Sequence, residues 1–165
     1  KYLFFWGHKS DAEQINKSCL SQWYEAPFVL DGIAYKTAEH YMMAQKAQLF
    51  KDEARFQQII NADDPSKAKA LGRSVANFNE AVWSQACFEI VVNANIGKFA
   101  QNSHLGDFLR ASQNRVLVEA SPVDRIWGIG LASDHEHAQM PSQWKGTNYL
   151  GFALMEVRDL LQLQE

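Results

Sequence analysis

The sequence predicts an α+β fold that is mainly helical, with a few short strands beside a helical body in a single compact domain over residues 1–165. Several long stretches carry apolar residues at helical spacing, whereas short β-branched or aromatic runs occur at only three places. No linker, internal repeat or low-complexity run divides the chain. Its 165 residues are enough to bury a substantial core without disulfide bonds.

Short strands are expected at 1–6, 28–35 and 116–127. The first is KYLFFW, an aromatic run that suits a buried strand. The second is a hairpin, because PFVLDGIAYK alternates around Asp31-Gly32, a pair that favours a primed turn. The third begins in the β-branched RVLVEAS and continues into IWGIG.

Helices are expected between these strands and at the end of the chain. Thr37 is the predicted N-cap of the first helix, because its hydroxyl can accept a hydrogen bond from an amide of the first turn. Two further residues indicate where helices begin. Pro65 suits the first position of a helix, and Asn79 suits an N-cap. The expected helices cover 37–50, 51–60, 65–72, 79–100, 103–111 and 149–163. The long irregular stretch 126–148 is typical of a functional loop.

Charge and cysteine content narrow the class of protein. The formal net charge of -3 argues against binding duplex DNA through many phosphate contacts. Two cysteines match neither a metal-ligand spacing nor a disulfide framework, which favours a reduced, cytoplasmic location. No apolar run reaches the length of a membrane span and no signal peptide is visible, so we expect no membrane association.

Glu39 and Lys46 are the first candidate site residues. With Met43 they are spaced by four and three residues, so all three project from one side of a helix. The spacing fits a solvated face equally well, with Glu39 merely favoured near a helix N-terminus. The neighbouring tyrosine and methionines indicate a partly buried setting, where a lysine loses its proton more easily and a carboxylate can be held for catalysis.

The segment EASPVDRIWGIG, residues 119–130, holds a second group of candidates. Asp124 and Arg125 precede Trp127, whose ring could stack on a base. Gly128 would let the backbone approach a ligand closely. Asp124 fits the cap of a turn as well as it fits a site, so that alternative stays open.

Gly146 and Asn148 lie just before the last predicted helix. Free backbone amides there would suit a phosphate, although a simple helix cap explains the same residues. His135 and His137 alternate in the preceding loop but lack a clear third ligand, so we expect no metal. No cofactor is expected either.

Taken together, these segments resemble the YbiA-like family, also called the NADAR (NAD and ADP-ribose associated) superfamily. The resemblance rests on FFWGH, LSQW, the hairpin leading into YKTAEHYMMAQKA, ALGRSV, Trp83, KF at 98–99, LVEASPVDRIWGIGL and WKGTNYLGFALMEVR. These segments follow the family's order over nearly the whole chain. Gln22 departs from the asparagine that many relatives carry after the Leu-Ser pair.

The resemblance implies an N-glycosidase that hydrolyses the ribose C1–N bond of small phosphorylated ribosides. The implied substrates are ribosylamino-pyrimidine phosphates of early riboflavin biosynthesis, or ADP-ribosyl conjugates such as ADP-ribosylated guanine, including ADP-ribosylated nucleobases in nucleic acid. The alternative is a non-catalytic module that binds ADP-ribose or NAD. No obligatory protein partner is expected.

The resemblance also gives the candidate residues their roles. Cleavage of a C1–N bond builds positive charge on the sugar, so one carboxylate would stabilise it while another protonates the departing base. Glu39 and Asp124 are expected to share these tasks, in an order that stays open. The alternative is a route in which Lys46 attacks C1 and passes through a Schiff base. Substrate contacts are expected from Trp83, Trp127, Asn148, Gly128, Gly146 and Arg125.

Overall fold

The computed structural model describes residues 1–8 and 14–164. Contacts within the chain divide it into two compact units. Unit 1 is Lys1–Ser21 with Ser103–Glu165, and unit 2 is Gln22–Asn102. Both contain helices and strands, with helix dominant, so the predicted fold class is confirmed. That the whole chain is a single domain stays a prediction.

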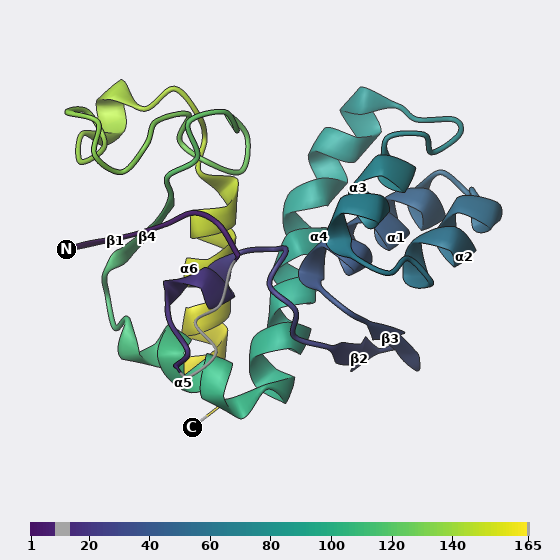
Figure 1. Ribbon diagram of the computed structural model, residues 1–165, viewed down its shortest axis with the longest axis horizontal. Coiled ribbons are helices and arrows are strands. Elements are labelled where there is room, and N and C mark those ends of the chain that lie inside the picture. Colours follow the sequence, from purple (N-terminus) through teal and green to yellow (C-terminus); the bar gives the residue numbers. More distant parts are fainter. Residues whose placement is uncertain (9–13, 165) are drawn as a thin grey trace. The chain divides into compact units, whose positions relative to one another are not determined.

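Unit 1 is built on two parallel strands and two helices (Figure 1). Strand β1 (Tyr2–Phe5) pairs in parallel with β4 (Val116–Glu119), with Phe5 opposite Glu119. Helix α6 (Tyr149–Gln162) packs on β4, and α5 (Ser103–Ala111) packs on α6. The short helices η1 (Lys17–Leu20) and η2 (Pro141–Gln143) complete the unit.

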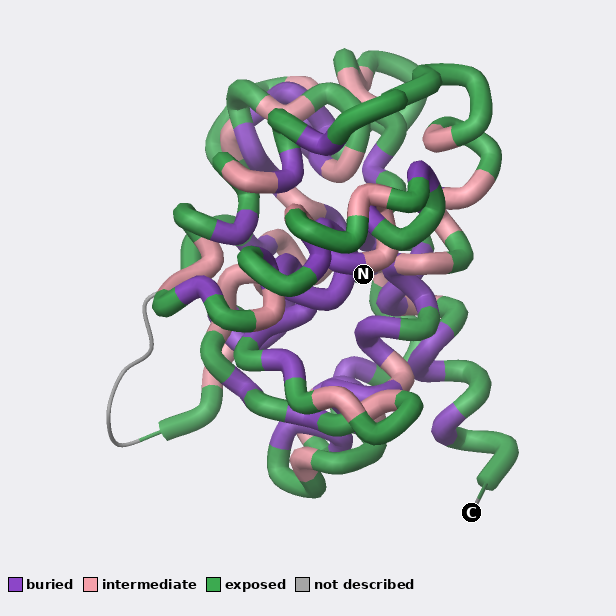
Figure 2. Tube along the Cα trace, turned by 90° about the vertical axis from the view of Figure 1, so that its right-hand side faces the viewer, coloured by how far each residue is buried: buried purple, intermediate pink, exposed green. Residues whose placement is uncertain are grey.

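Unit 2 joins a hairpin to four helices (Figure 1). Its elements are β2 (Phe28–Leu30), β3 (Ile33–Tyr35), α1 (Ala38–Leu49), α2 (Glu53–Ile60), α3 (Pro65–Gly72) and α4 (Glu80–Gln101). Helix α1 contacts each of the other three helices. Most of its residues are therefore buried, including the polar Glu39 and His40. Figure 2 marks the buried positions of the chain in purple.

The local signals in unit 2 act as the sequence predicts. Thr37 caps α1 by accepting a hydrogen bond from the amide of His40 at 3.1 Å. Asp31 and Gly32 have φ of 51° and 79°, the left-handed pair that a primed hairpin turn requires. Asn79 caps α4 in the same way as Thr37 caps α1. None of the described helices is long and apolar enough to cross a membrane.

The predicted strand at 116–127 is wrong in its second half. Strand β4 ends at Glu119, and the chain turns from there through residue 130 without strand pairing. The Ser121 hydroxyl accepts from the amide of Asp124 at 3.1 Å, and Asp124 Oδ1 accepts from the amides of Ile126 and Trp127, both at 2.9 Å. These side chains satisfy backbone donors that a strand would pair with a neighbour, so the apolar IWGIG forms a loop.

Candidate functional site

The nine predicted site residues fall into two groups, one in each unit. Unit 2 holds Glu39, Lys46 and Trp83. Unit 1 holds Asp124, Arg125, Trp127, Gly128, Gly146 and Asn148. The structure brings the members of each group together within their own unit.

Glu39 lies in the first turn of α1, and only 7% of its surface is exposed. Its amide donates to the carbonyl of Gln22 at 3.1 Å, which ties the start of α1 to the segment before the hairpin. The solvated-face interpretation of Glu39 is therefore wrong, because the side chain is buried. A buried carboxylate at a helix N-terminus is a group whose protonation and position the protein can control.

His40 fixes the same turn from the other side. Its Nδ1 lies 2.7 Å from the Thr37 hydroxyl and its Nε2 lies 3.1 Å from the carbonyl of Ala62. Burial lowers the pKa of His40, and the ring is completely enclosed. A neutral imidazole meets both contacts, since Nε2–H donates to Ala62 while Nδ1 accepts from Thr37. Both ring nitrogens of His40 thus hold the turn that carries Glu39 in place.

Lys46 lies two turns further along α1, against two aromatic rings. Its Nζ is 4.6 Å from the ring centroid of Phe78 and 5.6 Å from that of Trp83. Trp83 projects from the first turn of α4 and is half-buried, whereas Phe78 precedes that helix and is more exposed. The rings attract the ammonium through their electron-rich faces and at the same time exclude water from it.

The aromatic setting has an electrostatic consequence for Lys46. Desolvation by burial lowers its pKa below the ordinary lysine value, and the charge of Arg73 acts in the same direction. Glu80 and Glu39 oppose this shift, in that order of strength. Neutral amine is therefore more abundant at Lys46 than at an exposed lysine, and neutral amine is the form that attacks carbon.

In unit 1, the loop after β4 holds Asp124 and Trp127. Asp124 is half-buried and caps a turn through Oδ1, as one of its two alternatives predicted. The Trp127 ring lies edge-on to Tyr149, with centroids 5.9 Å apart and planes at 75°. Arg125, between them, is exposed. The loop thus presents an aromatic ring, a carboxylate and a guanidinium within four residues.

The prediction of free backbone amides just before α6 is wrong for Thr147 and Asn148. The amides of Thr147, Asn148, Tyr149 and Leu150 donate to carbonyls of residues 125–128 at 3.0–3.1 Å. The loop after β4 thereby satisfies the donors that a helix start would otherwise offer to an anion. Phosphate binding through these four amides is excluded while the loop keeps this conformation.

The glycines serve the same contact between the loop and the start of α6. A Cβ on Gly146 would collide with the carbonyl oxygen of Gly128 and with Cα of Arg125. A Cβ on Gly128 would lie 2.9 Å from the carbonyl oxygen of Glu119. Both positions need glycine because protein backbone, rather than a ligand, passes close by.

Asn148 also has a role inside the protein. Its backbone is left-handed, with φ of 52°, and its side chain is completely buried. Oδ1 accepts from the amide of Glu119 at 2.9 Å, and Nδ2 donates to the carbonyl of Leu117 at 3.0 Å. The side chain therefore binds the edge of β4, which a parallel neighbour would otherwise occupy.

Comparison with known proteins assigns the chain to a family. A family model described as the NADAR domain matches residues 4–162. The chain belongs to the NADAR family. The NADAR match includes both groups of candidate residues.

Named NADAR relatives are similar over most of the chain. An N-glycosidase of Acanthamoeba polyphaga mimivirus is 41% identical over 164 residues, which cover 96% of this chain and 95% of that protein. N-glycosidase YbiA of Escherichia coli strain K12 is 31% identical over 139 residues, or 84% of this chain and 78% of that protein. The NMR structure of E. coli YbiA covers 99% of this chain and 86% of that one, with a TM-score of 0.78 and 29% identity.

These NADAR relatives make the chain an N-glycosidase in the general sense, an enzyme acting on N-glycosyl bonds. A non-catalytic binding module is therefore not favoured. Sequence reasoning missed Phe78, whose ring is the nearer of the two at Lys46, and Glu80, the carboxylate with the larger effect on its charge. Their position beside the predicted cap Asn79 was the available signal, since that cap fixes where α4 begins.

Proposed function

We propose that the chain hydrolyses the ribose C1–N bond of small phosphorylated ribosides. Candidate substrates are ribosylamino-pyrimidine phosphates of riboflavin biosynthesis and ADP-ribosyl conjugates such as ADP-ribosylated guanine, free or in nucleic acid. Both classes share a ribose C1–N bond and a phosphate, so one chemistry would serve either. The cytoplasmic location stays a prediction from the sequence.

The observation that carries this proposal is the arrangement on α1. A buried carboxylate, Glu39, and a lysine with a lowered pKa, Lys46, extend from one helix beside two aromatic rings. Glycoside cleavage needs a carboxylate where positive charge develops, and a nucleophile or activated water at C1. An aromatic ring suits the departing base. A packed helix face alone would not need a buried carboxylate and a desolvated lysine together.

Two routes are open to these groups at C1. In the first, Glu39 directs a water to C1 while the C1–N bond breaks and the base leaves with its bonding electrons and a proton. In the second, neutral Lys46 attacks C1, the base departs in the same way, and the sugar ring opens to an imine that water then hydrolyses. The lowered pKa of Lys46 favours the second route.

The unit 1 residues would contribute to binding. Trp127 is proposed to contact the base or the ribose, and exposed Arg125 to contact a phosphate. Asp124 has committed Oδ1 to its turn, so we assign the second oxygen to the substrate. Asn148, Gly128 and Gly146 would shape this loop rather than touch the substrate, because their contacts lie within the protein.

The test is release of base from defined ribosides. The protein is incubated with a ribosylamino-pyrimidine phosphate and, separately, with ADP-ribosylated guanine, and free base is quantified by chromatography. We expect turnover of at least one of the two. If neither releases base while ADP-ribose still binds, the proposed reaction is wrong.

A further inference from the structure

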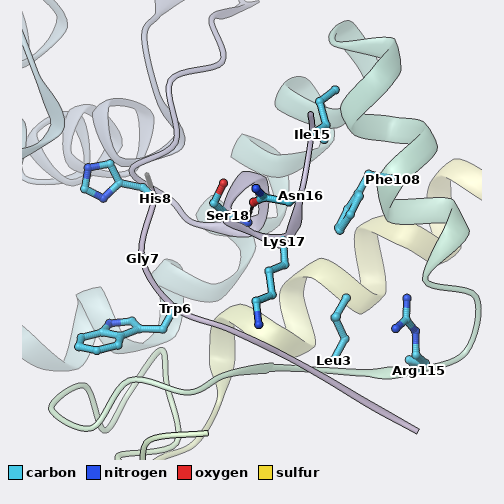
Figure 3. A pocket seen from close by; sticks show the side chains of 10 residues that line it. All are labelled: Leu3, Trp6, Gly7, His8, Ile15, Asn16, Lys17, Ser18, Phe108 and Arg115. Atoms are coloured by element: carbon cyan, nitrogen blue, oxygen red, sulfur yellow. Dashed lines mark hydrogen bonds between the residues drawn. The ribbon is translucent and has the colours of Figure 1, made fainter. Parts of the chain in front are cut away.

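Unit 1 contains a pocket that shares no residue with the candidate site. Its volume is about 850 Å³, within the range of about 300–1,000 Å³ typical of small-molecule sites. Strand β1 and the residues after it form one side, with η1 and the residues before it, α5 and the residue before β4 around the rest (Figure 3). The described residues that line it are Leu3, Trp6, Gly7, His8, Ile15, Asn16, Lys17, Ser18, Phe108 and Arg115.

Among the described residues that line this pocket, the lysine and the arginine are both cationic. Lys17 and Arg115 are exposed cations, and no aspartate or glutamate is among its described lining residues. Lys17 makes no hydrogen bond or ion pair with another described residue. Among the described residues, the Arg115 side chain donates only through Nε–H, to the Ser112 carbonyl at 3.4 Å. Its four remaining N–H donors are therefore available for an anion such as a phosphate.

The pocket also offers aromatic surface at a distance from Arg115. Trp6 is 61% exposed, an unusual degree for the largest apolar side chain. Figure 3 shows Trp6 and His8 at one end of the pocket and Arg115 at the other, with Lys17 extending from η1 between them. A ligand that used both ends would be elongated, with a flat ring at one end and a negative charge toward the other.

A buried hydroxyl in the pocket lining lacks a hydrogen-bond partner. Ser18 is 9% exposed, and its Oγ contacts no donor or acceptor among the described residues. Its backbone amide, by contrast, donates to Asn16 Oδ1 at 2.8 Å. Leaving such a group unsatisfied costs about 1–3 kcal/mol, which a polar group of a ligand or a bound water could recover.

We propose that this pocket binds a nucleoside phosphate, with the base on Trp6 and the phosphate between Lys17 and Arg115. The two cations match a phosphate, the exposed indole matches a base, and the volume matches a ligand of that size. The proposal goes beyond the N-glycosidase reaction and does not rest on it, because none of the proposed catalytic residues lines the pocket.

AMP is the probe, and its binding to the full chain is measured by isothermal titration calorimetry at fixed ionic strength. The variant Lys17→Ala/Arg115→Ala should bind AMP about tenfold more weakly or worse. The variant Arg55→Ala/Lys67→Ala removes the same two charges from unit 2 and should leave binding unchanged. Both pairs are at the surface, and thermal melting checks that each variant folds.

Trp6→Ala tests the base contact. It should weaken AMP binding while leaving the weaker binding of inorganic phosphate unchanged. The proposal is overturned if wild type does not bind AMP, or if the Lys17→Ala/Arg115→Ala variant binds it as well as wild type. If inorganic phosphate and AMP bind with equal affinity, the pocket is only an anion site and the proposed base contact is wrong. If the Lys17→Ala/Arg115→Ala variant also loses base-releasing turnover, the pocket belongs to the N-glycosidase site. The proposal of a separate nucleoside phosphate site is then overturned.

Discussion

The setting of Lys46 differs from that of an ordinary helix lysine. It lies against two aromatic rings, and desolvation by burial lowers its pKa, whereas Glu80 and Glu39 limit the shift. Its spacing from Glu39 was readable from the sequence. The rings were not, because Phe78 and Trp83 reach Lys46 only through the packing of α4 on α1.

The route through Lys46 predicts a specific pH dependence. Only the neutral amine attacks C1, so kcat/KM should rise with pH as Lys46 loses its proton. Because the pKa of Lys46 is lowered, kcat/KM should increase at a lower pH than the one at which an exposed lysine loses its proton. Steady-state rates across pH for wild type and Lys46→Met test this. An unchanged rise in the variant would assign it to another group.

A Schiff base at Lys46 can also be trapped chemically. Borohydride reduces an imine to a stable amine, so treatment during turnover should add the mass of the reduced sugar to the protein, at Lys46. Mass spectrometry of the intact chain and of its peptides measures this. Lys67→Ala should be labelled like wild type, and Lys46→Met should not. If the rate is normal and no adduct forms, the direct water route is correct.

At the level of elements, the start of α6 and the loop after β4 hold each other in place. Asn148 satisfies two backbone groups of β4, and the amides of residues 147–150 donate to carbonyls of the loop. The sequence showed a polar helix start, but whether its amides were free depended on residues twenty or more positions away. The local hydrogen bonds of Ser121 and Asp124 explain why IWGIG, which contains two isoleucines, is not a strand.

Replacing Asn148 should therefore lower stability rather than only weaken binding. Asn148→Gly keeps the left-handed backbone without strain and leaves the amide of Glu119 and the carbonyl of Leu117 unpaired. Two such losses should reduce the free energy of unfolding by roughly 2–5 kcal/mol. Urea denaturation measures it, with the exposed Gln143→Ala as control. Unchanged stability with weakened substrate binding would return Asn148 to a ligand role.

The first turn of α1 should be sensitive to acid through His40. Its folded pKa is below the ordinary histidine value of about 6.5, so the unfolded chain binds this proton more readily. The contribution of neutral His40 to the free energy of unfolding is therefore complete above a pH of about 6.5. It is lost as the pH falls through the folded pKa. The stability difference between wild type and His40→Gln should shrink over that window. The exposed His104→Gln should show no such change.

At the scale of the whole molecule, fold class and family were predictable from the sequence because their signals are local. Caps at Thr37 and Asn79 and a proline at the first position of α3 fix where helices begin, and the hairpin follows from Asp31-Gly32. The NADAR model extends over residues 4–162 and therefore includes sequence from both units. What the sequence left open was which polar residues are used inside the protein, since that depends on partners distant in the chain.

The central claim is that Glu39 acts in cleavage of the C1–N bond, and Glu39→Gln tests it most directly. The amide is nearly the same size as the carboxylate, so burial and packing are kept while the negative charge and its exchangeable proton are lost. Base release from the riboside that wild type turns over, and thermal melting, are measured for both proteins. We predict a fall in kcat of about a hundredfold or more with little change in melting temperature. Full activity in Glu39→Gln with lowered melting would contradict the account, because Glu39 would then serve only the packing of α1.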